Sequence, residues 1–349
     1  MRPWLWRVLV GLAALTLVGA GALWGAVGWL DGEAGAPHRP PADGPRLVEV
    51  EPGSSVVGIG RRLVDAGVVH DLRTFRWAVW RSGATRRLQA GEYRFEGPLS
   101  ARDVVEKIAR GEVHLRPITF PEGLTIAAMA VVFEQSGFGT AAEFAAAASA
   151  ADLVGDLDGD APDLEGYLFP DTYALPRGTM AARLVGLMVA RFREAFDPAL
   201  GEAAARHGLT VRQVVTLASL VEKETARADE RPLVAAVYHN RLRRRMLLQC
   251  DPTIIYALEK AGTYDGNLRR GDLSLDSPYN TYRYPGLPPG PIAAPGRAAL
   301  EAAVRPAETD HLYFVSRNDG SHVFASTLGE HNANVRKYQV QYFRERGSR

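Results

Sequence analysis

The segment 217–226, LASLVEKETA, holds the side chain whose type and position best suit acid–base chemistry. An α-helix turns by about 100° per residue, so Val215, Ala218 and Glu222 share one helical face. This stripe is apolar up to Glu222, which predicts a partly desolvated carboxyl group with a raised pKa and the properties of a general acid. Glu224 lies about 200° away around the helix and is expected to be solvated. An ordinary surface charge is the alternative for Glu222.

Other kinds of chemistry have little support in the residue pattern. The chain has a single cysteine, Cys250, so it forms no internal disulfide, and no histidine close in sequence could activate it as a nucleophile. His311, His322 and His331 lack the spacing of metal ligands. The formal net charge of +1 does not indicate a nucleic-acid partner. The sequence therefore predicts no metal, no cofactor and no nucleic-acid partner.

A long hydrophobic stretch occupies the N-terminus. Residues 8–30 carry no charge, and this length is sufficient for a helix that spans a bilayer. Arg2 and Arg7 precede the stretch and two acidic residues follow it, which predicts a cytoplasmic N-terminus with all later residues outside. The alternative is a cleaved signal peptide with small residues at 20–22. Because the apolar run continues beyond them, we favour an uncleaved anchor formed by residues 1–30.

The rest of the sequence indicates an α+β protein with two folded parts. Residues 31–45 are rich in glycine, proline and alanine, which is typical of a linker. We expect a small domain at 46–115 and a larger mixed α+β catalytic domain at 116–349. The start of the small domain, 46–70, combines a strand, a Pro-Gly turn and a helix, and resembles a LysM domain, a small fold that binds peptidoglycan or chitin. A generic α+β packing module is the alternative.

Local patterns predict individual elements. Ser100 and Thr210 are expected helix N-caps, the second in a capping box with Gln213. An Asn-Asp-Gly turn between two alternating runs predicts a hairpin at 310–326. A long loop without helical or strand period, 277–296, is rich in proline and aromatic residues, which favours a functional role. Other helices are expected at 56–69, 71–83, 179–197, 231–246 and 252–258, and strands within 47–53, 91–97 and 247–250.

Four segments together resemble the endolytic murein transglycosylase family (MltG, YceG-like). They are EGYLFPDTY at 165–173, LASLVEKET at 217–225, LQCDPTIIY at 248–256 and YNTYRYPGLPPGPIAAPG at 279–296. The resemblance implies a single-pass protein of the inner (plasma) membrane whose C-terminal part faces the periplasm or the cell exterior. It also implies a lyase that cuts nascent peptidoglycan glycan strands internally and leaves 1,6-anhydro-N-acetylmuramic ends.

The resemblance implies roles for single residues. The family's catalytic residue, the first glutamate of its VEKE motif, corresponds to Glu222. Expected substrate-binding residues are Gln249, Asp251, Asn280, Tyr282, Glu165 and Tyr173. Two of these have structural alternatives: Asp251 would N-cap a helix starting at Pro252, and Asn280 would cap a turn. Cys250 stands where the family usually has serine or threonine.

The implied chemistry needs only one acid. Glu222 would protonate the leaving glycosidic oxygen and then accept the proton of the muramyl 6-hydroxyl as that group attacks its own anomeric carbon. A hydrolytic muramidase is one alternative and would need a second carboxylate, such as Asp171 or Glu165. A peptidoglycan-binding scaffold without activity is another. Glycan strands are the expected partner, and cell-wall synthases are candidate protein partners.

Overall fold

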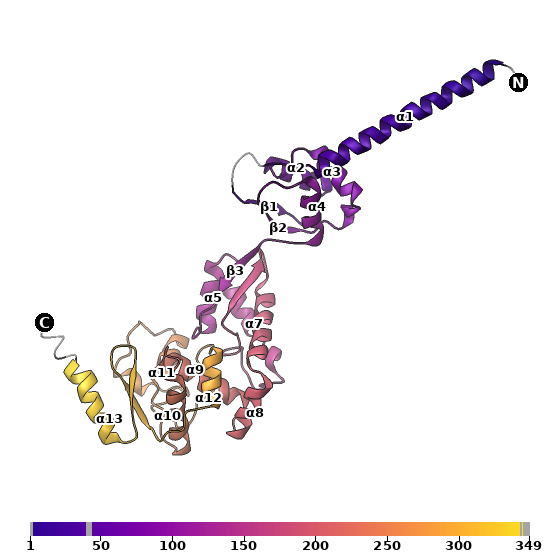
Figure 1. Cartoon of the computed structure of the whole chain (residues 1–349). Coiled ribbons are helices and arrows are strands. Elements are labelled where there is room, and N and C mark those ends of the chain that lie inside the picture. The colour runs from indigo at the N-terminus through magenta and orange to yellow at the C-terminus, as the bar shows by residue number, and fades with distance from the viewer. Residues whose placement is uncertain (1–2, 40–43, 343, 345–349) are drawn as a thin grey trace. The chain divides into compact units, whose positions relative to one another are not determined.

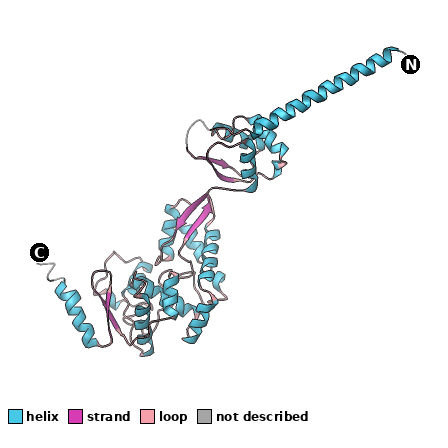
Figure 2. Ribbon diagram, in the orientation of Figure 1, coloured by secondary structure: helices cyan, strands magenta, loops and turns pink. Residues whose placement is uncertain are grey.

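The computed structural model describes residues 3–39, 44–342 and 344, and confirms the α+β class. The chain forms two compact units, Met1–Arg116 with Ala174–Arg177, and Pro117–Tyr173 with Gly178–Arg349. Figures 1 and 2 show that helices predominate and that the strands are short. The described strands pair in three two-stranded sheets, β1 with β2, β3 with β4 and β5 with β6.

The first unit is built around one antiparallel strand pair, in which Val48 faces Tyr93. Apolar faces of the surrounding helices complete its core. Ser100 caps its last helix in a capping box with Asp103, which confirms the predicted cap. The elements that begin in this unit are α1 (Pro3–Gly35), β1 (Arg46–Val50), α2 (Val56–Asp65), α3 (Leu72–Arg81), β2 (Gly91–Phe95), α4 (Ala101–Arg110) and β3 (Leu115–Thr119), with a 3₁₀ turn at Ala84–Arg86.

Helix α1 is long and apolar enough to cross a membrane by length and composition, and is consistent with a single-pass anchor. It continues to Gly35, so the prediction of a linker from residue 31 onward is wrong for its first five residues. Asp31 explains the extension, because it accepts a hydrogen bond from Trp77 Nε1 at 3.0 Å and pairs with Arg102 at 3.3 Å. Residues 40–43 of the expected linker lie outside the described residues.

The second unit is mainly helical. Its predicted hairpin is confirmed, whereas residues 247–250 form no strand. The elements that begin in this unit are α5 (Ile126–Gln135), α6 (Ala141–Ala148), β4 (Thr172–Pro176), α7 (Ala181–Ala195), α8 (Pro198–Arg206), α9 (Val211–Glu224), α10 (Arg231–Arg243), α11 (Asp251–Lys260), α12 (Arg297–Val304), β5 (Tyr313–Ser316), β6 (His322–Ala325) and α13 (Leu328–Val335), with 3₁₀ turns at Ala151–Val154 and Asp272–Ser274 and a π-helical segment at Arg336–Gln341.

Helix α9 is the core element of this unit. Thr210 and Gln213 form the predicted capping box at its start, and every residue from Val214 to Val221 is buried. It packs against α10, α11 and α12. The proline-rich loop is anchored on it, because Ile292 N donates a hydrogen bond to Ser219 Oγ at 3.1 Å. The long irregular loop is therefore held in place by the helix that carries both acids.

Gly166 makes a close contact that only glycine allows. Its φ is +83°, and an added Cβ would lie 2.5 Å from Pro291 Cβ and 2.8 Å from Val215 Cγ1. We expect Gly166→Ala to lower the free energy of unfolding by about 2–4 kcal/mol, through left-handed strain and overpacking. Urea titration with pulse labelling of Cys250, which is buried in the same unit, measures this change.

Gly186→Ala is the matched control for this prediction. Gly186 lies in α7, and an added Cβ there would meet no atom within 4 Å. The control should be neutral or stabilising by up to about 1 kcal/mol, because alanine is the better helix former. Equal effects of the two substitutions would show that the contact with Pro291 is not tight.

Candidate functional site

Glu222 is held in a buried ion pair. Its Oε1 accepts a hydrogen bond from Arg231 Nη2 at 3.0 Å, and its Oε2 accepts one from Gly296 N at 3.0 Å. The Glu222 side chain is only 5% exposed. Gly296 is the N-cap of α12, where a carboxylate is favoured by the helix dipole. Both oxygens of Glu222 are thus occupied in joining α9, α10 and α12.

Glu224 lies in a cavity of about 280 Å³, so the prediction that it is solvated is wrong. Its Oε2 accepts a hydrogen bond from Tyr238 Oη at 3.3 Å and lies 3.7 Å from Cys250 Sγ. Burial is the main cause of its raised pKa, and the negative charge of Asp251 adds to it. Segments distant in sequence cover this face of α9, which a helical-wheel pattern cannot reveal.

Three of the expected substrate-binding residues, Gln249, Asp251 and Tyr282, line this same cavity. Asp251 Oδ1 accepts a hydrogen bond from Tyr282 Oη at 2.6 Å. Cys250 is the N-cap of α11 but makes no side-chain cap, and Asp251 is the first residue of the helix. The Asp251 carboxylate therefore faces the cavity with Tyr282, rather than acting as the N-cap that was its alternative.

The backbone conformation of Gln249 is left-handed, with a φ of 51°. It is stabilised by the Gln249 N–H, which donates to Thr281 O at 3.1 Å, and by Arg241 Nη1, which donates to Gln249 Oε1 at 3.3 Å. Arg241 is buried and also donates through Nε to Leu312 O at 2.7 Å. Sequence reasoning missed this arginine, whose side chain joins α10 to the segments on both sides of the cavity.

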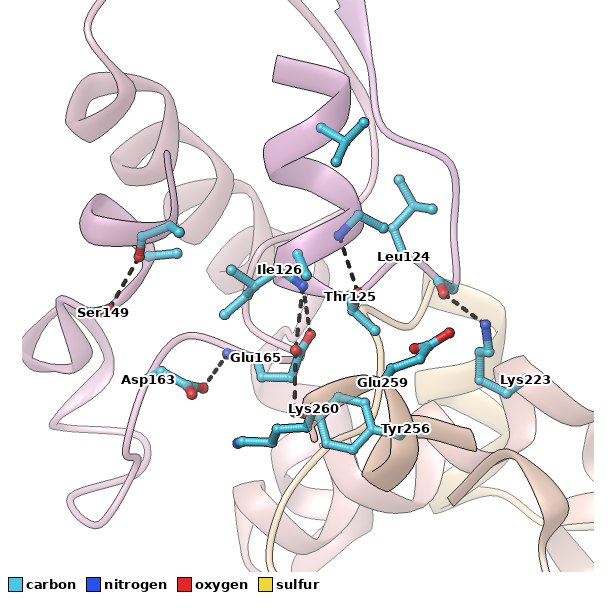
Figure 3. A pocket seen from close by; sticks show the side chains of 16 residues that line it. Leu124, Thr125, Ile126, Ser149, Asp163, Glu165, Lys223, Tyr256, Glu259 and Lys260 are labelled. Atoms are coloured by element: carbon cyan, nitrogen blue, oxygen red, sulfur yellow. Dashed lines mark hydrogen bonds between the residues drawn. The ribbon is translucent and has the colours of Figure 1, made fainter. Parts of the chain in front are cut away.

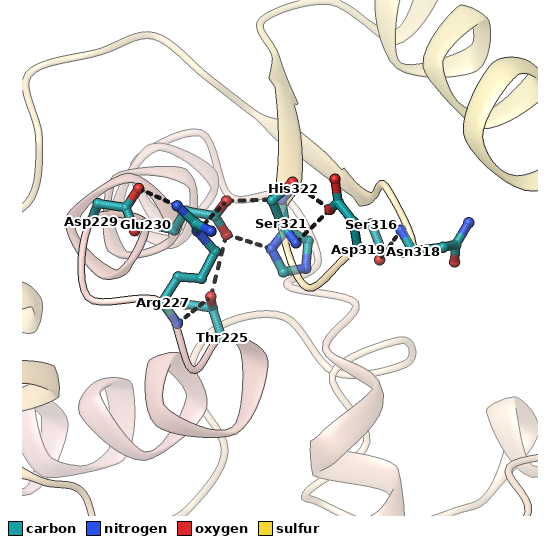
Figure 4. Close-up of polar contacts among 9 residues, drawn as sticks. All are labelled: Thr225, Arg227, Asp229, Glu230, Ser316, Asn318, Asp319, Ser321 and His322. Carbon is teal, nitrogen blue, oxygen red and sulfur yellow. Dashed lines mark hydrogen bonds and ion pairs between the residues drawn. The ribbon is translucent and has the colours of Figure 1, made fainter.

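One residue of the cavity lining, His322, forms a carboxylate–imidazole pair with Glu230 (Figure 4). His322, which lines the cavity, donates its backbone N–H to Glu230 Oε1 at 2.9 Å, and its Nδ1 lies 2.7 Å from Glu230 Oε2. Thr225 Oγ1 donates to the same carboxylate at 3.3 Å. Burial acts to raise the pKa of Glu230, but the hydrogen bonds from His322 outweigh it and lower that pKa. The sequence offered a weak signal for this pair, a histidine beside the predicted hairpin turn.

Two of the expected site residues have structural roles. Asn280 is fully buried, its Nδ2 donates to Leu273 O and Leu275 O, and its Oδ1 accepts from Tyr282 N at 2.9 Å. This is the turn-capping alternative, and Asn280 acts by shaping the loop that carries Tyr282. Tyr173 donates its hydroxyl to Phe169 O at 2.7 Å, outside the residues that line the cavity.

The two candidate second acids do not line the cavity of Glu224. Asp171 forms an ion pair with Arg191 Nε at 2.9 Å. Glu165 lines a separate cavity of about 620 Å³ (Figure 3), where Ile126 N donates to its Oε1 at 3.1 Å and Tyr256 Oη donates to its Oε2 at 3.3 Å. Burial raises the pKa of Glu165 to about 8. The carboxylate that does share the cavity of Glu224 is Asp251.

Comparison with known proteins gives a consistent result. The sequence matches the YceG-like family over residues 48–337. It is 32% identical over 307 residues to the endolytic murein transglycosylase of Bacillus subtilis (strain 168), a match that covers 83% of this chain and 84% of that protein. A relative of the same name from Streptococcus pneumoniae serotype 2 is also 32% identical, but the match covers only 58% of that longer protein.

The fold agrees with a solved structure. A crystal structure of a yceG-like protein from Listeria monocytogenes is 29% identical and superposes with a TM-score of 0.57. The match covers 83% of this chain and 98% of that one. The chain belongs to the YceG-like family.

Proposed function

We propose that the protein is a membrane-anchored lytic transglycosylase that cuts peptidoglycan glycan strands internally, with Glu224 as its acid and base. The observation that carries the proposal is the position of the Glu224 carboxyl group in a cavity that also contains Asp251 and Tyr282, where burial raises its pKa. The Bacillus and Streptococcus relatives that are called endolytic murein transglycosylases support the substrate class. Helix α1 would be the anchor, with the later residues outside the cytoplasm.

In the proposed reaction, Glu224 acts first as a general acid and then as a general base. Glu224 protonates the oxygen of the bond between N-acetylmuramic acid and N-acetylglucosamine, and the C1–O bond breaks. The muramyl 6-hydroxyl then attacks C1 while the Glu224 carboxylate accepts its proton, which closes the 1,6-anhydro ring. Asp251 stabilises the positive charge that develops at C1 in the transition state. Gln249 and Tyr282 are proposed to hold sugar hydroxyl or N-acetyl groups.

What supports Glu224 over Glu222 as the acid is the set of partners of each side chain. Glu222 is paired with Arg231 and bonded to Gly296 N, so both of its carboxylate oxygens are already engaged inside the protein. Glu224 accepts hydrogen bonds from a tyrosine hydroxyl and a thiol, and no ion pair of its carboxylate is found among the described residues. We propose that Glu222 instead positions the end of α9. We therefore propose Glu224, two residues further along the same motif, as the catalytic residue in place of Glu222.

Hydrolysis is the second candidate function, and one observation favours keeping it. Asp251 shares the cavity with Glu224, so a second carboxylate is available to activate water or to act as a nucleophile. Asp171 and Glu165, the acids that the sequence suggested for this role, do not line the cavity of Glu224. Cell-wall synthases as protein partners remain a prediction from the family resemblance.

The experiment that tests the proposal is a digest of purified peptidoglycan by the full-length protein in detergent, with the products identified by mass spectrometry. We expect 1,6-anhydro-muramyl ends and fragments from within strands. Reducing muramyl ends would establish hydrolysis and assign Asp251 to the second carboxylate role. Binding of glycan without any cutting would support a scaffold instead.

A further inference from the structure

We propose that the 620 Å³ cavity around Glu165 binds the stem peptide of the peptidoglycan strand whose sugars lie at Glu224. This inference rests on the proposed function and extends it from glycan to peptide. The cavity is lined by residues of α5, α6 and α11, by the segment that carries Glu165, and by Lys223 at the end of α9 (Figure 3).

The large cavity lies close enough to the small one to receive the stem peptide that branches from the muramic acid. Lys223 lines the large cavity and its neighbour Glu224 lines the small one, and consecutive Cα atoms are about 3.8 Å apart. Helix α11 also contributes residues to both cavities. Asp251 lines the small cavity, and Tyr256, about 7.5 Å further along the helix, lines the large one. A peptide of four or five residues extends to about 13–18 Å, which is enough to enter the large cavity.

The walls favour a peptide over a second stretch of glycan. Small apolar side chains of α5 and α6, including Ala127, Ala128 and Ala145, face the cavity and can pack against the methyl groups of alanine residues. The lining has three hydroxyl groups, and each makes a hydrogen bond inside the protein; that of Tyr256 donates to Glu165 Oε2 at 3.3 Å. Thr125 Oγ1 accepts from Ala128 N at 3.2 Å, and Ser149 Oγ donates to Ala145 O at 3.1 Å. A sugar ring would need such groups as hydrogen-bond partners.

The charges of the lining match a stem peptide, which carries carboxylates and, at its diamino residue, an amine. Lys223 and Lys260 supply positive charge, and Asp163 and Glu259 supply negative charge. Lys260 Nζ lies 5.7 Å from the centroid of the Tyr256 ring, which restricts its position. Glu165 at the base of the cavity is mostly protonated at neutral pH because burial raises its pKa to about 8. The lysines can therefore bind peptide carboxylates without competition from that acid.

The test compares two substrates and two tryptophan variants of the full-length protein in detergent. Ala127 is exposed on the cavity wall, so Ala127→Trp fills the cavity without disturbing the core. Ala142→Trp, on an exposed position of α6 away from the lining, is the matched control. Cutting is measured on glycan strands with stem peptides and on strands from which an amidase has removed them.

We expect Ala127→Trp to raise KM about tenfold for peptide-bearing strands and to leave peptide-free strands and the Ala142→Trp control unchanged. An equal rise of KM for both substrates would make the cavity a glycan subsite, and no change for either would exclude contact with substrate; both outcomes overturn the proposal. If the wild type cuts neither strand, the proposed function fails. Titration with free stem tetrapeptide then decides the inference: binding that Ala127→Trp abolishes supports it, whereas absent or unchanged binding overturns it.

Discussion

Replacement of Glu224 by glutamine is expected to lower the rate of glycan-strand cutting by about 10²- to 10⁴-fold, the usual contribution of a general acid. The amide keeps the shape of the carboxyl group but cannot protonate a leaving glycosidic oxygen. The fold should persist, because a neutral group replaces a carboxyl whose buried position already disfavours its charge. The rate is measured from the release of new chain ends by mass spectrometry, with thermal unfolding as the check on folding.

Glu222→Gln is the matched control, two positions away on the same helix. It leaves the Arg231 guanidinium without its buried carboxylate partner, which should cost about 3 kcal/mol of stability, moderated by Glu122 Oε2 at 3.4 Å from Arg231 Nη2. The folded fraction of this variant should still cut strands. The assignment of Glu224 would be overturned if Glu224→Gln cut at the wild-type rate while folded Glu222→Gln did not.

Glu165 is expected to make the stability of the second unit depend on pH. Its pKa is raised from 4.5 to about 8 by burial, so the folded state binds this proton more tightly than the unfolded state. The contribution of Glu165 to the free energy of unfolding is complete below pH 4.5, where both the folded and the unfolded state are protonated. It is lost as the pH rises towards 8. The shift corresponds to a loss of up to about 5 kcal/mol in the free energy of unfolding.

The comparison of wild type with Glu165→Gln isolates this contribution. The glutamine variant keeps an acceptor for Ile126 N but has no proton to lose. All six tryptophans of the chain precede residue 81, in the first unit, so tryptophan fluorescence does not report on Glu165. Urea titrations followed by pulse labelling of Cys250, at pH 5 and pH 8, follow the second unit instead. Identical pH dependence in both proteins would mean that Glu165 does not titrate in this range.

Local features of this protein were readable from the sequence because their causes are local. The N-cap at Ser100 and the capping box at Thr210 depend on residues within one helical turn, and the hairpin at 310–326 depends on its turn. The apolar N-terminal stretch follows from composition alone. Four motifs together were sufficient to indicate the family. They also directed attention to the segment that carries Glu224, and to three other residues that line the small cavity.

The tertiary structure decided which glutamate of that segment lies in the cavity. Helical periodicity separates Glu222 from Glu224 by about 200°, but it cannot tell which face is covered, or by what. Arg231 and Gly296 reach Glu222 from other elements and hold it as an ion pair. Cys250, Asp251 and the hairpin surround Glu224 and remove it from water. Desolvation and partner charges arise from residues distant in sequence, and these long-range contacts determine the pKa of a carboxyl group.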